Sequence, residues 1–356
     1  MKKRIMAIMA IMLSLVLAVC MLAGCGGNGD DKKNDKEQEE QGKQEEQNGT
    51  SGSDVVTIKF SHPDPEGSVL DRGVKAFAKD VEERSGGTIK VDVYPANQLG
   101  SLTEVIEGIQ MGSVDMAFSN TSYVTSFCPE VGVFDMPFLI DDDEHAYAAL
   151  DGDVGTSLAA TLEQNNIKVL SWWPMGFRNL TTTEEKKIES VDDIKGLTVR
   201  TMTNEIHQKM FLNLGANPVT IDWNELFTAL QQGVCDAQEN PINMIYNNNV
   251  YEVQHYLYNT EHAYAITVMM ISPSTWDKLS DEQKEWVEES AKVATESYRE
   301  DYKEETEANL KKLTEECGME YIELDKEELR EKTKSVYDEY PELADSVEKV
   351  RSYGTK

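Results

Sequence analysis

Two arginines stand where a side chain could bind a carboxylate. Arg200 ends the apolar segment 197–199, and Arg178 follows the apolar stretch 171–177. A guanidinium keeps its charge in a closed pocket and donates two parallel hydrogen bonds to a carboxylate. Ligands of open α/β sheets lie where strands run into loops. Most arginines are solvated surface charges, but the positions of these two at strand ends predict an anion-binding role.

A third polar position follows another apolar segment. Residues 224–232 look helical, and 234–238 are expected to form a short strand that ends near Asn240. The asparagine side chain carries an acceptor and two donors, which suits a carboxylate or a hydroxyl. Pro241 restricts Asn240 to an extended backbone and helps to fix its direction. Two interpretations stay open at this point: a ligand contact, or an Asx turn before the next helix.

The chain lacks the common short motifs of catalytic sites. Residues 55–356 contain no G-x-S-x-G, H-E-x-x-H, P-loop or G-x-G-x-x-G pattern. The five histidines, at positions 62, 145, 207, 255 and 262, have no spacing typical of metal ligands. This favours a binding protein over an enzyme, and an extracytoplasmic enzyme acting on sugar acids is the weaker alternative.

The elements that must position these residues alternate between strand-like and helix-like stretches. β-branched runs predict the strands, and apolar residues three or four apart predict the helices. We expect strands at 55–60, 88–95, 114–119, 168–173, 218–221 and 234–238, and helices at 69–85, 101–115, 204–214 and 224–232. A β-α-β-α-β order predicts parallel strands with crossover helices. Ser101 and Glu104 form a sequence capping box at the start of one helix.

The C-terminal part contains a long, mostly charged segment. From Ser280 to about Cys317 the pattern predicts one helix of about ten turns. Apolar residues at steps of three and four give it a single buried stripe. They are Val287, Ala291, Ala294, Tyr298 and Tyr302. We expect a helix that lies across two lobes. A coiled-coil dimerisation helix is the alternative, which the narrow stripe of mostly small residues disfavours.

The first 54 residues predict export and attachment rather than a folded domain. A basic start precedes an apolar run that ends in 22-LAGC-25, which is similar to a bacterial lipobox. Such signals are cut before the cysteine, so residues 1–24 are the expected signal peptide and Cys25 the expected lipid-carrying (palmitate) residue. Residues 25–54 are polar and acidic and are expected to be a disordered tether. For the apolar run before Cys25, a transmembrane anchor is the alternative interpretation.

Charge and cysteine content restrict the partners. The chain has 34 basic and 65 acidic residues, and its net charge is −31. The signal peptide contains three of the basic residues, so the mature chain has 31 basic against 65 acidic residues, a net charge of −34. Such a charge excludes nucleic acid as a general partner. The scattered Cys128, Cys235 and Cys317 predict buried thiols and leave one disulfide open.

Several phrases together resemble the solute receptors of TRAP transporters, the DctP family. They occur in the family's order and cover nearly all of residues 55–265. They are 94-YPANQLGS, 112-GSVDMAFS, 135-DMPFLI, 176-GFRNLTTT, 195-KGLTVR, 214-LGANPVT, 225-ELFTALQQGVCDAQENP and 251-YEVQHYL. The 225–241 block is the most specific, because members typically read ALQQGVVDGQENP there. Cys235 stands where valine is common, and Ala237 stands where glycine is usual.

The resemblance implies an α/β, two-lobed fold of the periplasmic-binding-protein type, with a hinge and a long helix spanning both lobes. Lobe I is expected at 55–174 with 265–305, and lobe II at 175–264 with 306–356. It implies a monomeric receptor without a cofactor, on the extracytoplasmic face of the cell membrane, or in the periplasm of a Gram-negative cell. Such a receptor delivers a small organic acid to the small and large membrane subunits of an ion-gradient-driven permease. A solute sensor feeding a receptor kinase is the alternative. C4-dicarboxylates, hexuronates, keto acids and sialic acid all fit as ligands.

The resemblance also assigns roles to residues of lobe II. Arg200 matches the arginine that pairs with the substrate carboxylate, and Arg178 matches an arginine that often assists it. Asn240 matches an asparagine that contacts the ligand. Trp223 matches an aromatic that often lines the pocket, for which an ordinary core tryptophan is the alternative.

The remaining expected contacts are of two kinds. Lobe I is expected to supply Asn120 and His62, each at the end of a strand, with Tyr123 as a further contact, and a satisfied turn residue is the alternative for each. In some members a glutamine and a glutamate help to hold a cation, and Gln238 and Glu239 match that pair in position.

Overall fold

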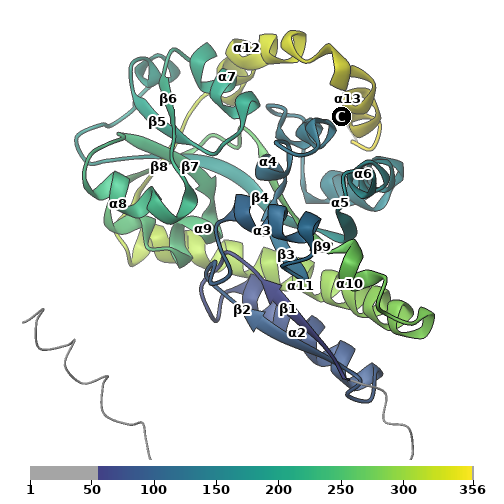
Figure 1. The fold of residues 1–356 in the computed structure, drawn as a ribbon. Helices are drawn as coiled ribbons and strands as arrows, with labels where there is room; N and C mark the ends of the chain where they lie inside the picture. Colours follow the sequence, from purple (N-terminus) through teal and green to yellow (C-terminus); the bar gives the residue numbers. More distant parts are fainter. Residues whose placement is uncertain (1–54, 355–356) are drawn as a thin grey trace, which may run out of the picture. The chain divides into compact units, whose positions relative to one another are not determined.

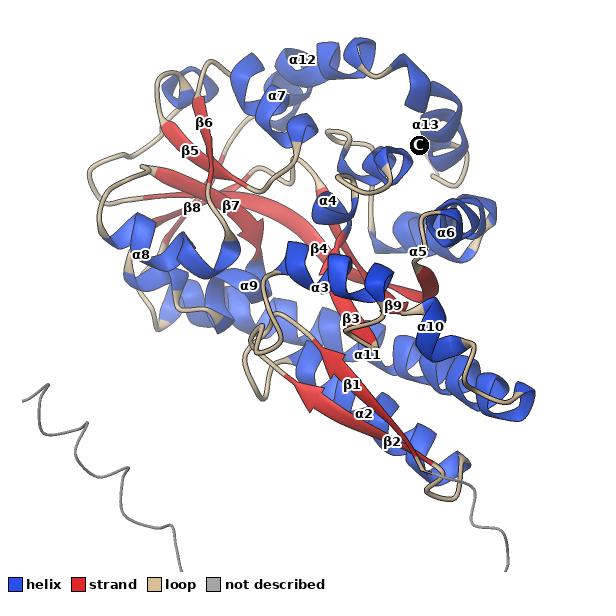
Figure 2. Cartoon of the chain, in the orientation of Figure 1, coloured by secondary structure: helices blue, strands red, loops and turns tan. Residues whose placement is uncertain are grey.

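The computed structural model describes residues 55–354 and has a mixed α/β fold (Figure 1). In this part of the chain ten strands join in one sheet, in the order β2-β1-β3-β9-β4-β7-β5-β6, with β8 beside β4 and β10 beside β8 (Figure 2). The strands are β1 (Val56–Ser61), β2 (Ile89–Tyr94), β3 (Met116–Asn120), β4 (Lys168–Thr182), β5 (Thr198–Thr201), β6 (Asn217–Thr220), β7 (Ala237–Pro241), β8 (Tyr256–Asn259), β9 (Tyr264–Ile271) and β10 (Glu320–Glu323).

The helices cover both faces of the sheet (Figure 2). They are α2 (Val69–Arg84), α3 (Leu102–Met111), α4 (Thr121–Val124), α5 (Asp143–Asp151), α6 (Asp153–Gln164), α7 (Glu205–Asn213), α8 (Leu226–Gln231), α9 (Ile242–Asn247), α10 (Pro273–Trp276), α11 (Asp281–Glu315), α12 (Lys326–Thr333) and α13 (Ala344–Arg351), with 3₁₀ turns η1 (Pro129–Asp135) and η3 (Trp223–Glu225). None of these described helices has the length and apolar character needed to cross a bilayer. The signal peptide, Cys25 and tether predicted within residues 1–54 lie outside the described residues.

The first strands follow the predicted β-α-β-α-β order. β1 pairs in parallel with both β2 and β3, which confirms the crossover arrangement. Ser101 and Glu104 form both hydrogen bonds of the predicted capping box at the start of α3. Gly112 ends that helix in a left-handed conformation, with φ 77°, which glycine adopts without strain. The strand that follows, β3, carries Asn120 at its carboxyl end.

The long strand β4 belongs to two groups of strands. Its residues Lys168–Phe177 pair antiparallel with β9, whereas Arg178–Thr182 pair with β7. We call β2, β1, β3, β9 and the first part of β4 lobe I, and the remaining strands lobe II. The sequence predicted a strand only over 168–173, and the structure extends it to Thr182. Pro174 and Gly176 do not end the strand but lie at a bulge, where the register shifts between them.

The strand predicted at 234–238 begins three residues later. Gly233 has a positive φ of 68° and Val234 is 55% exposed, so this part is a turn on the surface. Pairing with β5 starts only at Ala237, opposite Val199. Gln238, Glu239 and Asn240 therefore lie within β7 itself rather than beyond its end.

The long helix α11 begins at the predicted cap, where Ser280 and Gln283 form a capping box, and ends at Glu315, three residues before Gly318. It packs against α2 in lobe I and α9 in lobe II, as expected for a helix that spans both lobes (Figure 1). Every residue of its predicted apolar stripe is buried in the chain's own core. The stripe is therefore not available for a coiled coil.

The C-terminal segment differs from the expectation that 306–356 belong to lobe II. α12 packs against α7 of lobe II, but α13 packs against α6 of lobe I. The His145 ring nitrogen Nε2 lies 2.8 Å from the carbonyl of Val350, and the Tyr353 hydroxyl accepts a hydrogen bond from the backbone of Asp153. The chain thus returns to lobe I because apolar positions of α13 complete the core there.

The cysteines agree with the expectation only in part. Cys128 and Cys235 are buried, while Cys317 is half-buried, and all three are unpaired. The sequence left one disulfide open, and the described residues contain none.

Tyr298 and Tyr302 of α11 support the bulge in β4. The Tyr298 hydroxyl donates to the carbonyl of Pro174 at 2.9 Å, and the Tyr302 hydroxyl donates to the carbonyl of Met175. Both tyrosines are buried. Since a bulge interrupts the regular pairing of the strand, these hydroxyls provide donors for two carbonyls that are out of reach of water.

We expect Tyr298→Phe to lower the free energy of unfolding by about 1–3 kcal/mol, because the buried carbonyl of Pro174 loses its donor. Urea denaturation followed by circular dichroism measures this change. Tyr251→Phe is the control, since that hydroxyl bonds to Asn249 on the surface, and should alter stability by less than about 0.5 kcal/mol. Equal effects of the two substitutions would contradict the role of Tyr298.

Candidate functional site

A cavity of about 380 Å³ lies where the two lobes meet. Its walls come from strand ends, short helices and loops of both lobes. The lining residues are Pro63, Leu102, Asn120, Tyr123, Met175, Arg178, Arg200, Met202, Trp223, Asn240, Met244 and Thr267. Of these 380 Å³ of empty space, only about 20 Å³ can hold the centre of a water-sized sphere, so the cavity is narrow in the described arrangement of the lobes. Both predicted arginines, Asn240, Trp223, Asn120 and Tyr123 are thus brought together in one place.

Arg200 lies on β5, one residue before its end, and its side chain is completely buried. Its Nε donates to the carbonyl of Ile221 at 2.8 Å, and its Nη2 donates to the hydroxyl of Tyr123 at 3.3 Å. The other terminal nitrogen, Nη1, is buried and has no hydrogen-bond partner. A buried cation with free donors is costly, so this geometry calls for an acceptor in the cavity.

Arg178 is in a different situation, because its charge is already paired. Its Nε and Nη2 donate to the two carboxylate oxygens of Glu239, the second at 2.9 Å. Nη2 also donates to the side-chain oxygen of Asn240 at 3.0 Å. The guanidinium borders the cavity but is held by this network, so it fixes the shape of the wall and leaves Arg200 the less satisfied cation.

Glu239 is fully buried among positive and hydrogen-bonding groups. Its carboxylate lies 3.0 Å from Nε2 of His262 and 3.6 Å from Nδ1 of His207. Burial alone would raise the pKa of Glu239, but the charge of Arg178, the hydrogen bond with His262 and the nearby ring of His207 hold the pKa well below its usual range. The glutamate is therefore ionised and neutralises Arg178.

The geometry does not favour a cation site at Gln238 and Glu239, which stays a prediction. Neither residue lines the cavity, and both oxygens of Glu239 face Arg178 and histidines. Gln238 donates to the hydroxyl of Thr181 at 2.8 Å and accepts from Asn240. The partners of Glu239 come from distant segments, so no local pattern in the sequence connects them with it.

Asn240 lines the cavity and does not form the alternative Asx turn. Its side-chain oxygen accepts from Arg178 and its amide donates to Gln238. Helix α9, which follows, has Pro241 at its N-cap and no side-chain cap. Trp223 is half-buried at the cavity wall and packs against apolar clusters of both lobes, so it is a pocket residue and a packing residue at once.

Of the residues expected from lobe I, two line the cavity and one does not. Asn120 caps α4 by accepting a hydrogen bond from the backbone of Ser122, as the alternative interpretation expected, and it also borders the cavity. His62 is buried against Asp71 at 3.3 Å, and burial lowers its pKa to about 4. The adjacent Pro63 lines the cavity in its place, because the chain turns between the two positions.

Thr267 is a lining residue that the sequence reasoning missed. It lies on β9, is almost fully buried, and its hydroxyl has no hydrogen-bond partner. The register places it directly opposite Asn120 of β3. It is the one hydroxyl-bearing aliphatic residue in the otherwise apolar strand 264-YAITVMMI, a signal that the sequence offered.

A second set of contacts joins the lobes beside the cavity. Asn204, the N-cap of α7, donates to Asp135 at 2.9 Å and to the carbonyl of Ser122 at 3.3 Å. The buried ring of His207 lies between Asp135 of lobe I, at 3.5 Å, and Glu239 of lobe II, at 3.6 Å. Burial opposes the charged imidazole, but the two carboxylates outweigh it and raise the pKa of His207 to about 8.

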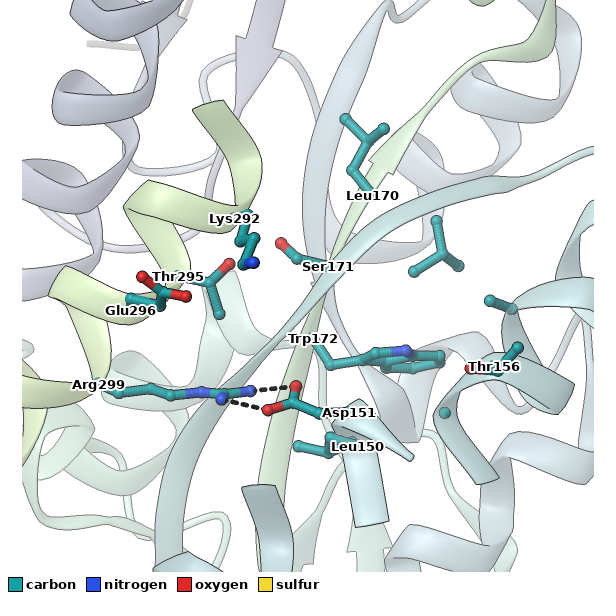
Figure 3. A pocket seen from close by; sticks show the side chains of 13 residues that line it. Leu150, Asp151, Thr156, Leu170, Ser171, Trp172, Lys292, Thr295, Glu296 and Arg299 are labelled. Atoms are coloured by element: carbon teal, nitrogen blue, oxygen red, sulfur yellow. Dashed lines mark hydrogen bonds and ion pairs between the residues drawn. The ribbon is translucent and has the colours of Figure 1, made fainter. Parts of the chain in front are cut away.

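Another, larger cavity of about 1040 Å³ lies between α6, the start of β4 and α11 (Figure 3). Arg299 donates to both oxygens of Asp151 there, at 2.6 and 2.8 Å. Figure 3 shows this ion pair between Arg299 of α11 and Asp151, with Lys292 and Glu296 on the same helix as Arg299. Because its strongest charges already satisfy each other, we place the solute site at the interlobe cavity.

Comparison with known proteins agrees with this site. The family model of the bacterial extracellular solute-binding proteins, family 7, named DctP, matches residues 60–343. The chain belongs to this family. It is 32% identical over 245 residues to the 2,3-diketo-L-gulonate-binding periplasmic protein YiaO of Escherichia coli, covering 69% of this chain and 74% of that protein. It is 34% identical over 243 residues to the C4-dicarboxylate-binding protein DctB of Bacillus subtilis, covering 68% and 69%.

The fold agrees with solved structures of this family. A TRAP periplasmic solute-binding protein from Polaromonas sp. JS666, bound to D-erythronate, superposes with a TM-score of 0.81 at 31% identity, covering 85% of this chain and all of that chain. The chain therefore has the two-lobed α/β fold of DctP proteins, as the sequence predicted. The family consists of extracytoplasmic solute receptors rather than enzymes.

The histidine between the lobes gives a pH dependence whose sign follows from its pKa. His207 has a folded pKa of about 8, above the unfolded value near 6.5. Its contribution to stability is thus complete below pH 6.5 and is lost as the pH rises through 8. The groups that face it are Asp135 and Glu239, and behind Glu239 lie Arg178 and His262.

We expect the free energy of unfolding of the wild type to fall, relative to that of His207→Gln, by about 2 kcal/mol between pH 6 and pH 9. Urea denaturation at half-unit pH intervals measures it. His255→Gln, on the exposed His255, serves as the control and should keep the wild-type profile. A His207→Gln profile parallel to the wild type would contradict the interlobe charge cluster.

Proposed function

We propose that this protein is the solute receptor of a TRAP transporter that captures a small organic acid between its lobes and delivers it to an ion-gradient-driven permease. One observation carries the proposal: the completely buried Arg200 borders the interlobe cavity with a terminal nitrogen that has no partner. A carboxylate is the acceptor that a guanidinium binds best. Family membership supports the same class of solute.

The composition of the cavity wall favours capture over catalysis. Its residues include no carboxylate, imidazole, thiol or amine that could act as a base or a nucleophile. Glu239, the nearest ionised carboxylate to Arg178, is held by its ion pair and by hydrogen bonds. A solute bound here would leave unchanged, as a transport receptor requires.

Closure of the lobes would couple binding to a change of shape. The lining residues come from both lobes, so a solute that contacts Arg200 and Asn120 together favours the arrangement in which the lobes meet. The two antiparallel strands β4 and β9, with α11, connect the lobes and are the proposed hinge. We assign 55–177 and 264–305 to lobe I and 178–263 to lobe II, with α12 on lobe II and α13 on lobe I.

The proposed cellular arrangement follows from the N-terminal sequence. After removal of residues 1–24, Cys25 would carry lipid and residues 25–54 would tether the receptor to the extracytoplasmic face of the cell membrane. The small and large membrane subunits of the permease are the proposed protein partners. Mass spectrometry of the membrane-extracted protein tests the anchor, since a diacylated or triacylated Cys25 peptide is the expected product.

We expect Arg200→Ala to weaken binding of a carboxylate solute by about 2–5 kcal/mol, because one partner of a desolvated charge pair is lost. That loss is roughly 30-fold to several thousand-fold in affinity. A thermal-shift screen of organic acids first identifies a ligand, and calorimetry then measures the dissociation constants. Arg84→Ala, on the partly exposed Arg84 far from the cavity lining, is the control. Less than a tenfold change for Arg200→Ala would remove it from the site.

A further inference from the structure

The charges around the interlobe cavity leave one positive charge without a partner. The lining contains two cations, Arg178 and Arg200. Arg178 forms an ion pair with Glu239, and both side chains are buried. Arg200 has backbone and tyrosine partners, none of them charged. The described lining therefore offers one uncompensated positive charge to a solute.

The neighbouring titratable groups do not add to that charge. His207, when protonated, lies between two carboxylates, one of which is Asp135. Burial lowers the pKa of His262, so its ring next to Glu239 is neutral. The charges of Arg178 and Glu239 cancel, and those of protonated His207 and Asp135 cancel as well. The cluster of side chains behind the cavity wall therefore has no net charge. A solute with two carboxylates would thus bury one charge without a counter-charge, which is costly.

The side chains of Tyr123 and Asn240 also line the cavity, and each is already hydrogen-bonded to another side chain. The rest of the wall is apolar except at one point. Leu102, Trp223 and three methionines, Met175, Met202 and Met244, supply most of the lining. The exception is the cross-strand pair Asn120 and Thr267, which lie opposite each other on β3 and β9 and both face the cavity. No lysine or histidine accompanies them in the lining, so this pair suits a neutral polar group of the solute.

The free hydrogen-bonding atoms of this pair match a hydroxyl group. Thr267 is 1% exposed and its hydroxyl is without a partner. The oxygen of Asn120 accepts from the backbone of Ser122, whereas its amide nitrogen has only the sulfur of Met175, at 3.6 Å. Sulfur is a weak acceptor. The amide of Asn120 is therefore available as a donor, and the neighbouring hydroxyl of Thr267 as a donor or acceptor. A solute hydroxyl can form hydrogen bonds with both.

We propose that the solute is a hydroxylated monocarboxylate and that Thr267 and Asn120 are the residues that recognise its hydroxyl. This rests on the proposed function, because Arg200 must hold the carboxylate. A site that hydrogen-bonds a hydroxyl rejects analogues without it more strongly than an apolar site does, since its own buried groups are then left unpaired. Dicarboxylates are disfavoured by charge, and simple fatty acids by the unpaired threonine.

The test is calorimetry with acids matched in length. D-erythronate, succinate and butyrate have four carbons and differ in hydroxyl groups and charge, and D-galactonate and galactarate repeat the comparison with six carbons. The wild type should bind erythronate or galactonate at least tenfold more tightly than the other acids of equal length. Tighter binding of succinate or galactarate, lost in Arg200→Ala, would overturn this inference and leave the proposed function intact. Binding of none of the five acids would count against both.

Substitutions of Thr267 test the residue itself. Thr267→Val removes the hydroxyl with little change in shape and should weaken binding of the preferred hydroxy acid about tenfold, while butyrate binding stays the same or improves. Thr267→Ser should restore the preference. Thr121→Val is the matched control, because Thr121 is equally buried with an unpartnered hydroxyl but does not line the cavity. Equal losses for both valine variants, or none for Thr267→Val, would refute the role. If the melting curve shows that Thr267→Val does not fold, Thr267→Ala replaces it. Comparing Thr267→Ala with Thr267→Ser then tests the hydroxyl in the same way.

Discussion

The buried guanidinium of Arg200 is the constraint on which the site depends. Removing a cation from water costs several kcal/mol unless charge and hydrogen bonds compensate it. The protein supplies a carbonyl and a tyrosine hydroxyl, and one terminal nitrogen is left unpartnered. An anion in the cavity would supply what is lacking. The unpartnered nitrogen of Arg200 costs free energy while the cavity is empty. The same nitrogen would bind the proposed anion strongly and selectively.

The second arginine shows how the same residue type can serve another purpose. Arg178 is neutralised by Glu239, which is bonded in turn to His262. A fully satisfied buried network is rigid and holds neighbouring side chains in one arrangement. Asn240 is part of it, so the network aims this amide at the cavity wall. In the proposed function, Arg200 would offer its charge to the solute, while Arg178 holds part of the cavity wall in place.

The path of β4 forms part of the junction between the lobes. The strand exchanges β9 for β7 as its partner between Phe177 and Arg178, so Arg178 lies at the junction. β9 runs beside it and brings Thr267 opposite Asn120. Because a few continuous elements join the lobes, the proposed closure would bend these elements and change the contacts of the cavity between the lobes.

The sequence by itself determined the local elements and the family. Apolar periodicity and capping residues predicted α2, α3 and α11, because these signals are local, and the 225–241 block indicated the DctP fold. Expected strand ends drew attention to Arg200 and Arg178; Arg200 lies next to the end of β5, whereas Arg178 lies inside β4. Only the tertiary structure decided which charges are free: Glu239 neutralises Arg178 across 61 positions of the chain, and His62 turns away to Asp71. It also decided that Thr267 faces the cavity and that α13 returns to lobe I. Contacts between distant segments depend on how the strands are ordered and paired in the sheet, and no local pattern in the sequence contains that information.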